Sequence, residues 1–441
     1  MFRNRLYLAV VCSHFAVDTL NSLGPVLLAV LAIPLGLSNA QIGFALTLYL
    51  LANSLSQPLF GWLADRMPNR AVLLAGLGVA WLALFFCVVA LSANWTLLLV
   101  CFALAPLGSG LFHPIGTASA ATAHPDRANS ATAVFFFCGQ MGLALGPILG
   151  GFLFASAGNL GVLPLALLAL LPAGLLISVR HAGQVSPDDR ETGHHQSLPD
   201  RSLPHHTDRG TTRTHHWRRL AQVGQWLSLA MLAFVLLVAV RSSIQVVYQS
   251  FLPKLFADRD WTPQLYGLLA GTFMGAAATG NVFMGNLADR FGMRVATVVP
   301  LLLSVPAGLV CLAAPSVAIT FVAAGLAGVL VGGQHSILVV HAQNLLPTGR
   351  RFAAGLILGF TFASGAIGAW CAGLLADVYD LPVVMQAVTW MGLVAALLAL
   401  TLPQRQGRTL PTDVIERSTA HAPGVIDVGQ VAEPPPVPRS S

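Results

Sequence analysis

The sequence predicts an all-α membrane protein of twelve transmembrane helices, arranged as two six-helix bundles with pseudo-twofold symmetry. Of its 441 residues, 55% are apolar and only 9% are charged, whereas a soluble domain averages about 25% charged residues. Twelve apolar windows follow one another along the chain, and a short motif recurs in its two halves. Apolar content this high also excludes an intrinsically disordered chain.

The twelve apolar windows form two sets of six. The first set falls at about residues 6–33, 40–64, 71–92, 96–121, 129–156 and 160–180, and the second at about residues 224–250, 262–288, 293–314, 317–345, 350–377 and 381–403. Each can hold the roughly 20-residue helix that crosses a bilayer. The first window is too long, and lacks the cleavage site, for a signal peptide. The predicted domains are an N-terminal bundle (1–180), a linker (181–220), a C-terminal bundle (221–403) and a tail (404–441).

The linker and the tail are hydrophilic, and both are predicted to be disordered. The linker contains histidine pairs at 194–195, 205–206 and 215–216. Paired histidines can bind metal, but nothing in the surrounding sequence orders them, so no metal site is predicted. The six cysteines lie inside apolar windows without a CxxC spacing, which indicates neither a disulfide framework nor a metal knuckle.

The basic residues indicate the orientation of the chain. Twelve spans place both termini on one side, together with Arg66, Arg127 and most other arginines, whereas the opposite side carries only Lys254 and Arg259. By the positive-inside rule both termini are cytoplasmic, in a multi-pass protein of the plasma or inner membrane. The net charge of +6 is therefore a topology signal spread over short loops, and it predicts no nucleic-acid partner.

A loop motif occurs once in each half. The sequence GWLADRMPNR occupies residues 61–70, after the second window, and GNLADRFGMR occupies residues 285–294, after the eighth. Both copies fall in short loops on the predicted cytoplasmic side. Two copies in matching loops indicate duplicated bundles related by an axis along the membrane normal.

This motif resembles the signature between spans two and three of the major facilitator superfamily, and the resemblance covers both halves. The first copy departs from the pattern at Met67-Pro68, where a glycine is usual. The resemblance implies a secondary transporter that works as a monomer. It also implies a cytoplasmic latch between Asp65 and Arg127, and between Asp289 and Arg350 or Arg351; the alternative is that these residues only fix topology. The predicted gating residues are Gly61, Asp65, Arg66, Arg70, Arg127, Gly285, Asp289, Arg290, Arg294 and Arg350.

Polar residues at membrane depth are informative, because an ionisable side chain there costs about 2.5–3.5 kcal/mol. His14, Asp18 and Asn21 have the spacing i, i+4, i+7 and so share one helix face. Arg241, Gln245 and Tyr248 repeat this spacing in the seventh span, the repeat partner of the first. Both stripes are predicted to face a central cavity.

Asp18 is the predicted proton carrier, with His14 one turn away to share the proton. Arg241 is predicted to attract an anionic group of the substrate, or alternatively to be the counter-ion of Asp18. His113 in the fourth span and His335 in the tenth each follow glycine-containing segments. We expect both in the cavity; the alternative for each is a hydrogen-bonded core histidine.

The pair of segments Ser13-His14-x-x-x-Asp18 and Phe112-His113-Pro114 resembles the fosmidomycin-resistance branch of the superfamily, whose members are drug-efflux-type transporters and their relatives. The resemblance implies that His14, Asp18 and His113 belong to the functional cavity.

The fifth span carries a glycine-rich motif that resembles the antiporter signature of proton-driven drug exporters, although Ala133 replaces an earlier glycine of that pattern. Small residues every four positions permit close helix contact, and a proline can bend the helix; ordinary packing is the alternative explanation. The residues of the motif are Gly142, Gly146, Pro147, Gly150 and Gly151.

These observations predict a transporter and not an enzyme. The predicted mechanism is proton-coupled antiport that exports a small organic compound or drug. An anionic group on this compound is the expected partner of Arg241. The predicted partners are this substrate, protons and the lipid bilayer, and no resident cofactor is expected. One alternative is a proton symporter that imports an organic anion. Two others are a non-transporting sensor and a membrane haem or redox protein with His14, His113, His335 and His341 as ligands. The redox alternative leaves the doubled loop motif unexplained.

Overall fold

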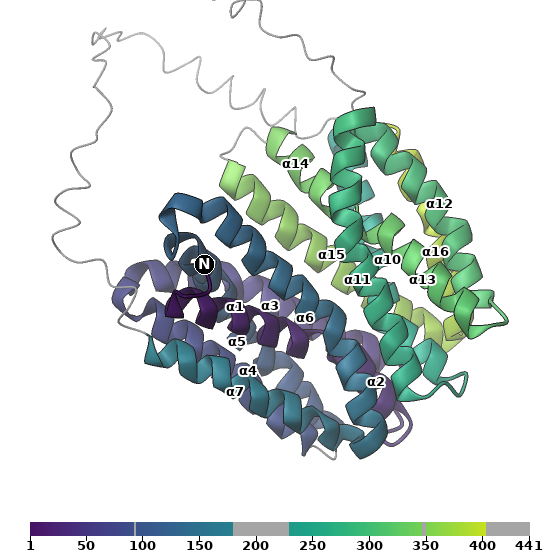
Figure 1. Ribbon diagram of the computed structural model, residues 1–441. Helices are drawn as coiled ribbons and strands as arrows, with labels where there is room; N and C mark the ends of the chain where they lie inside the picture. The colour runs from purple at the N-terminus through teal and green to yellow at the C-terminus, as the bar shows by residue number, and fades with distance from the viewer. Residues whose placement is uncertain (92–93, 180–228, 346–349, 403–441) are drawn as a thin grey trace, which may run out of the picture.

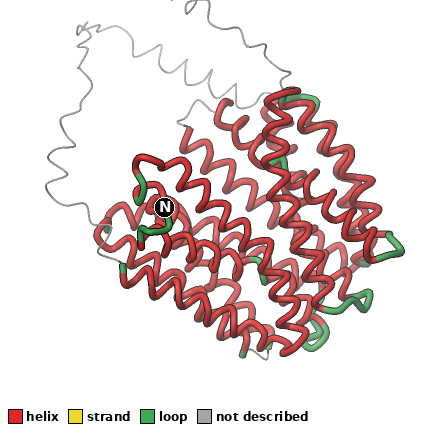
Figure 2. Tube along the Cα trace, viewed as in Figure 1, coloured by secondary structure: helices red, strands yellow, loops and turns green. Residues whose placement is uncertain are grey.

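The computed structural model of the protein describes residues 1–91, 94–179, 229–345 and 350–402. The predicted linker and tail lie outside these residues. Helices make up nearly all of the described chain, and it contains no strand (Figure 2). The N-half consists of α1 (Arg5–Asn21), α2 (Gly24–Ala32), α3 (Asn39–Arg66), α4 (Ala71–Ala90), α5 (Trp95–Thr122), α6 (Ala128–Ala157) and α7 (Val162–Ser178). The C-half consists of α10 (Leu229–Ala257), α11 (Pro263–Phe291), α12 (Met293–Ala313), α13 (Val317–Gly332), α14 (His335–Leu345), α15 (Arg350–Tyr379) and α16 (Leu381–Ala399).

The predicted number of spans agrees with the structure. Ten helical stretches of the described chain are long and apolar enough to cross a membrane. One of them, Ser130–Ser178, contains both α6 and α7, and the 28-residue helix α3 is not among the ten. With α6 and α7 counted separately and α3 added, there are twelve spans, six in each half.

Two predicted windows are broken helices. The first span divides into α1 and α2 ahead of Gly24-Pro25, where the proline has no backbone N–H to donate. The tenth span divides into α13 and α14 after Gly332-Gly333. The seventh span also differs, because α10 continues to Ala257, seven residues past the predicted end. Non-helical backbone at membrane depth is tolerated only where it is buried in protein or lines a cavity, so these breaks point to the centre of the molecule.

The two halves meet chiefly along α3 with α15 and α6 with α11, and α2 also packs on α10. Helices α6 and α11 can be followed side by side in Figure 1. A Cβ atom on Gly43 would lie 2.8 Å from the backbone oxygen of Ala369, and one on Gly373 would lie 2.4 Å from that of Asn39. A Cβ on Gly267 would lie 2.4 Å from the oxygen of Pro147. These helices therefore touch backbone to backbone, which only glycine permits.

The span-five motif supplies contacts on two sides of α6. A Cβ on Gly142 would lie 2.5 Å from the backbone oxygen of Phe15 in α1, and one on Gly151 would lie 2.4 Å from that of Pro263 in α11. The motif thus packs α6 against the helix that carries Asp18 and against the opposite half.

Polar contacts between the halves occur at the end of the bundle away from the N-terminus. The Asp377 carboxylate of α15 accepts hydrogen bonds from the backbone N–H groups of Asn39 (2.7 Å) and Ala40 (3.0 Å), which begin α3. Thr47 donates to the backbone oxygen of Ala366 at 2.6 Å. Together with the glycine contacts, these bonds close that end of the molecule.

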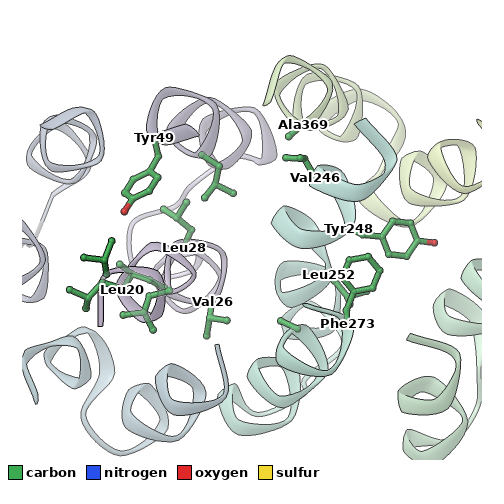
Figure 3. Close-up of a cluster of buried hydrophobic side chains, with 14 of the residues drawn as sticks. Leu20, Val26, Leu28, Tyr49, Val246, Tyr248, Leu252, Phe273 and Ala369 are labelled. Carbon is green, nitrogen blue, oxygen red and sulfur yellow. The ribbon is translucent and has the colours of Figure 1, made fainter. Parts of the chain in front are cut away.

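Apolar side chains fill the centre of this closed end. Figure 3 shows Leu20, Val26 and Leu28 of the first span on one side and Val246 and Leu252 of α10 on the other, all of them buried. These buried side chains fill the space between the first span and α10.

Candidate functional site

A cavity of about 400 Å³ lies between the two halves, within the range of small-molecule sites. Its walls come from the first span, α3, α5 and α6 on one side and from α10, α11, α14 and α15 on the other. Six of the predicted site residues line it: His14, Asp18, Asn21, His113, Gln245 and His335.

The Asp18 carboxylate joins two histidines from different helices. His14 Nε2 lies 3.2 Å from Asp18 Oδ2, and His113 Nε2 lies 3.3 Å from Asp18 Oδ1. On the other side of each ring, Nδ1 faces a backbone oxygen: that of Phe135 at 2.7 Å for His14, and that of Ser109 at 2.8 Å for His113. We call His14, Asp18 and His113 the Asp18 cluster.

The backbone oxygens fix the protonation pattern of the two rings. An oxygen of a backbone carbonyl only accepts, so each Nδ1 carries the proton that it donates. In a neutral ring Nε2 is then an acceptor, and it faces a carboxylate oxygen that also only accepts when ionised. A hydrogen bond at either contact therefore requires one additional proton, on the imidazole or on Asp18.

Amide and hydroxyl groups complete the surroundings of the carboxylate. Asn21 Nδ2 donates to Asp18 Oδ1 at 3.1 Å and to Ser109 Oγ at 2.9 Å. The Tyr49 hydroxyl of α3 donates to Asn21 Oδ1 at 2.7 Å. The Asp18 side chain is only 9% exposed, so these bonds provide the solvation that water would otherwise supply.

Two imidazoles and one carboxylate also form a donor set of a kind that binds transition metals, and their ligand atoms lie within 4.8 Å of one another. In both rings the contact of Nδ1 with a backbone oxygen leaves Nε2 as the nitrogen that faces Asp18, an arrangement that suits a shared proton and a metal ion alike.

The predicted place of Arg241 in the cavity is wrong. Its side chain is 1% exposed and does not line the cavity. Nε and Nη2 donate to the backbone oxygen of Val331 at 3.0 and 2.8 Å, and Nη2 donates to that of Gly332 at 2.8 Å. These oxygens end α13, where the break leaves them without the N–H groups of a next turn. A cation at a helix C-terminus is favourable, so Arg241 stabilises the broken span and forms no ion pair with Asp18.

Tyr248 also lies away from the cavity. Its hydroxyl is 2.6 Å from Thr389 Oγ1, and its ring stacks on Phe273 (Figure 3). An α-helix turns about 100° per residue, so Arg241 and Tyr248 point to one side of α10 and Gln245 lies at the boundary. The α10 residues that line the cavity are Ser242, Gln245, Val246, Gln249 and Ser250.

The two histidines of α14 lie in different surroundings. His335, at the start of α14, lines the cavity. His341 is buried against Phe234, with ring centroids 4.9 Å apart, and is not among the lining residues.

The predicted gating residues form no ion pairs in the part of the chain that the structure describes. Arg66 lies over the Trp62 ring, 3.9 Å from its centroid, and Arg294 donates to the backbone oxygen of Leu402 at 2.6 Å. The side chain of Arg350 lies outside the described residues. Those exposed to solvent are Asp65, Arg66, Arg70, Arg127, Asp289 and Arg290. Since the closed end is the opposite one, the latch stays a prediction for another state.

Several lining residues were missed by the sequence analysis. Tyr49, Asn53 and Gln57 of α3 have the spacing i, i+4, i+8, which indicates a shared helix face, as in the first span. Gln249 follows Gln245 at i+4, so the same spacing indicates a shared face, whereas Gln140 has no such polar neighbour and carries no such signal.

Comparison with known proteins places the chain in a family. A family model of the Major Facilitator Superfamily matches residues 6–251 and 234–428. An uncharacterized MFS-type transporter of Bacillus subtilis is 26% identical over 402 residues, with 89% of this chain and 91% of that protein covered. The fosmidomycin resistance protein of Escherichia coli is 26% identical over 400 residues, with 90% and 92% covered.

The structural comparison agrees on the fold. The crystal structure of a D-xylose-proton symporter superposes with a TM-score of 0.70 at 14% identity, covering 93% of this chain and all of that one. The family model matches both halves of the sequence, and the superposition covers nearly the whole chain. The chain therefore belongs to the Major Facilitator Superfamily, a family of membrane transporters.

Proposed function

We propose that the protein is a proton-coupled antiporter that exports a small organic compound, and that the Asp18 cluster carries the protons. The observation that supports this most is the buried carboxylate held between two histidines on the wall of the cavity. Each of the two contacts needs a proton to become a hydrogen bond, so the cluster has room for up to two.

Loss of these protons has a structural consequence. Without them, the lone pairs of both Nε2 atoms face an ionised carboxylate, and the contacts become repulsive. His14 and Asp18 belong to α1, His113 to α5, and Tyr49 of α3 joins the network through Asn21. A change of protonation therefore acts on three helices, one of which packs on the opposite half. This is the kind of differential interaction that shifts a two-state equilibrium.

Export is supported by a relative and by the fifth span. A relative that covers nine-tenths of the chain is named for fosmidomycin resistance, and export is a direct route to resistance. The glycine-rich face of α6 packs on both the helix of Asp18 and the C-half. The importer of an organic anion finds less support, because no lysine or arginine lines the described cavity.

The test uses a panel of toxic compounds in a sensitised bacterial host, neutral ones together with the anionic phosphonate fosmidomycin. We expect expression of the protein to raise the tolerated concentration of at least one compound of the panel, and the Asp18→Asn variant to lose this effect. Everted membrane vesicles then give the direction: acidification of the lumen should drive uptake of the same compound. Uptake into right-side-out vesicles with an inward proton gradient would instead identify a symporter.

A further inference from the structure

We propose that the cavity binds an uncharged, hydroxyl-rich solute, a polyol or monosaccharide, through carboxamide side chains of both halves. This inference rests on the transport function above and names the class of its substrate.

The first observation is a set of carboxamides without partners. Seven carboxamides line the cavity, of which Asn21 and Asn281 are hydrogen-bonded to protein. The other five are Asn53 and Gln57 of α3, Gln140 of α6, and Gln245 and Gln249 of α10. Within the described chain none of these side chains forms a hydrogen bond to protein. Oδ1 of Asn53 is shielded from solvent and still has no partner. A buried acceptor left unpaired is unfavourable, and a rotation of this amide toward the cavity would let a ligand donor satisfy it.

The second observation is the charge of the lining. No lysine or arginine is among the described lining residues, and Asp18 is the one acidic residue there. That carboxylate already contacts His14, His113 and Asn21. The remaining titratable side chains of the described lining are His335 and Tyr49. An anion would therefore lack a fixed counter-charge, and a cation would compete with two histidines for Asp18; an uncharged solute avoids both costs.

The third observation is the match between the groups offered and the groups of a carbohydrate. A carboxamide presents one acceptor oxygen and two N–H donors, and a hydroxyl group both donates and accepts. Phe136 of α6 and Phe362 of α15 line the same cavity from opposite halves and are 49% and 41% exposed. Their rings suit the C–H surfaces of such a solute. An apolar drug would leave the carboxamides unpaired, and a site with buried polar groups strongly rejects a ligand that cannot form hydrogen bonds with them.

The experiment measures binding to the full-length protein in detergent at one pH, with no gradient. Three neutral probes are used, D-glucitol, ribitol and D-xylose, each with the acid and the amine of the same carbon frame. We expect at least one neutral probe to bind and to raise the unfolding temperature. Its acid and amine counterparts should bind at least about tenfold more weakly. The inference is overturned if no neutral probe binds, or if a charged counterpart binds as tightly.

Substitutions then locate the site. Gln245→Leu and Gln140→Leu should each weaken binding of the neutral probe about tenfold, as expected for the loss of one or two hydrogen bonds. The matched control is Gln386→Leu, on the exposed face of α16, which should leave binding unchanged. Gln140 is itself exposed, so its replacement is compatible with folding even if that of Gln245 is not. Equal affinities for all three variants would contradict the inference.

Asp18→Asn separates this inference from the proton mechanism. The binding assay involves no gradient, so this variant should still bind the neutral probe even where gradient-driven transport is lost. Binding of the neutral probe that is about tenfold weaker in Gln140→Leu and Gln245→Leu, but kept in Asp18→Asn, assigns recognition to the carboxamides.

Discussion

Asp18 lies inside a membrane span because each of its carboxylate oxygens has a partner. His14 contacts one oxygen, and His113 and Asn21 contact the other. Groups linked in this way act as a unit, so a substitution in one of them affects the others beyond its own contact. The backbone of α6 at Gly139 also lies directly against the cluster, so a substitution there tests how tightly the cluster is enclosed.

Gly139→Ala is expected to disrupt the cluster without removing any of its groups. A Cβ atom at this position would lie 2.5 Å from His14 Nε2 and 2.7 Å from Asp18 Oδ2, so the side chains must move. Overpacking of this kind costs roughly 1–3 kcal/mol. We expect at least a tenfold loss of proton-driven flux and a lower unfolding temperature in detergent. Gly174→Ala, with nothing within 4 Å of the new atom, is the control; equal behaviour of the two variants would refute the tight enclosure.

Arg241→Gln tests the structural role of the buried guanidinium. The variant leaves the backbone oxygens of Val331 and Gly332 with fewer donors, at a cost of about 1–3 kcal/mol. We therefore expect a lower unfolding temperature but unchanged preference between neutral and anionic compounds. Arg290→Gln, at an exposed position, should change neither. A variant of normal stability that discriminates differently against anions would restore the anion site predicted from the sequence.

At the scale of the helices, one contact links the halves through a helix terminus. The N-terminus of α3 carries partial positive charge, and Asp377 of α15 places a carboxylate on its first N–H groups. The bond exists only while the two halves are together at this end. It therefore favours the state that the structure describes.

Asp377→Asn should weaken closure at this end. Interactions of an anion with a helix N-terminus contribute about 0.3–2 kcal/mol, which corresponds to a shift of roughly twofold to thirtyfold in the ratio of closed to open states. Spin labels at Ile33 and Val378, both exposed, report the distance between the halves. Asp260→Asn, in the exposed loop between α10 and α11, is the control. An unchanged distance distribution in Asp377→Asn would show that the cap does not hold the closed state.

For the whole molecule, the number of spans and their division into two related halves could be predicted from the sequence. Apolar windows indicate spans regardless of tertiary contacts, and the repeated loop motif indicates two related halves. The broken spans were not predicted, because glycine and proline occur both in continuous and in interrupted membrane helices. At the second break, the backbone oxygens of Val331 and Gly332 lack helical N–H donors. Arg241, about 90 positions earlier in the chain, supplies these donors.

The candidate site could be predicted only where several polar residues share one helix face. The stripe of His14, Asp18 and Asn21 lines the cavity as expected. Periodicity shows that residues share a face but not what that face contacts, which is why Arg241 and Tyr248 were misplaced. Their face of α10 turns into the C-half, and the adjacent face meets the cavity.

In the proposed function, protons on the Asp18 cluster drive transport between two states of the molecule. The most direct measurement compares two fluxes of one substrate in proteoliposomes containing the Asp18→Asn variant. Exchange of labelled for unlabelled substrate needs no net proton movement, whereas concentrative transport under an imposed pH gradient does. We predict that exchange persists and that gradient-driven accumulation disappears. Accumulation at the level of the unmodified protein would contradict the claim.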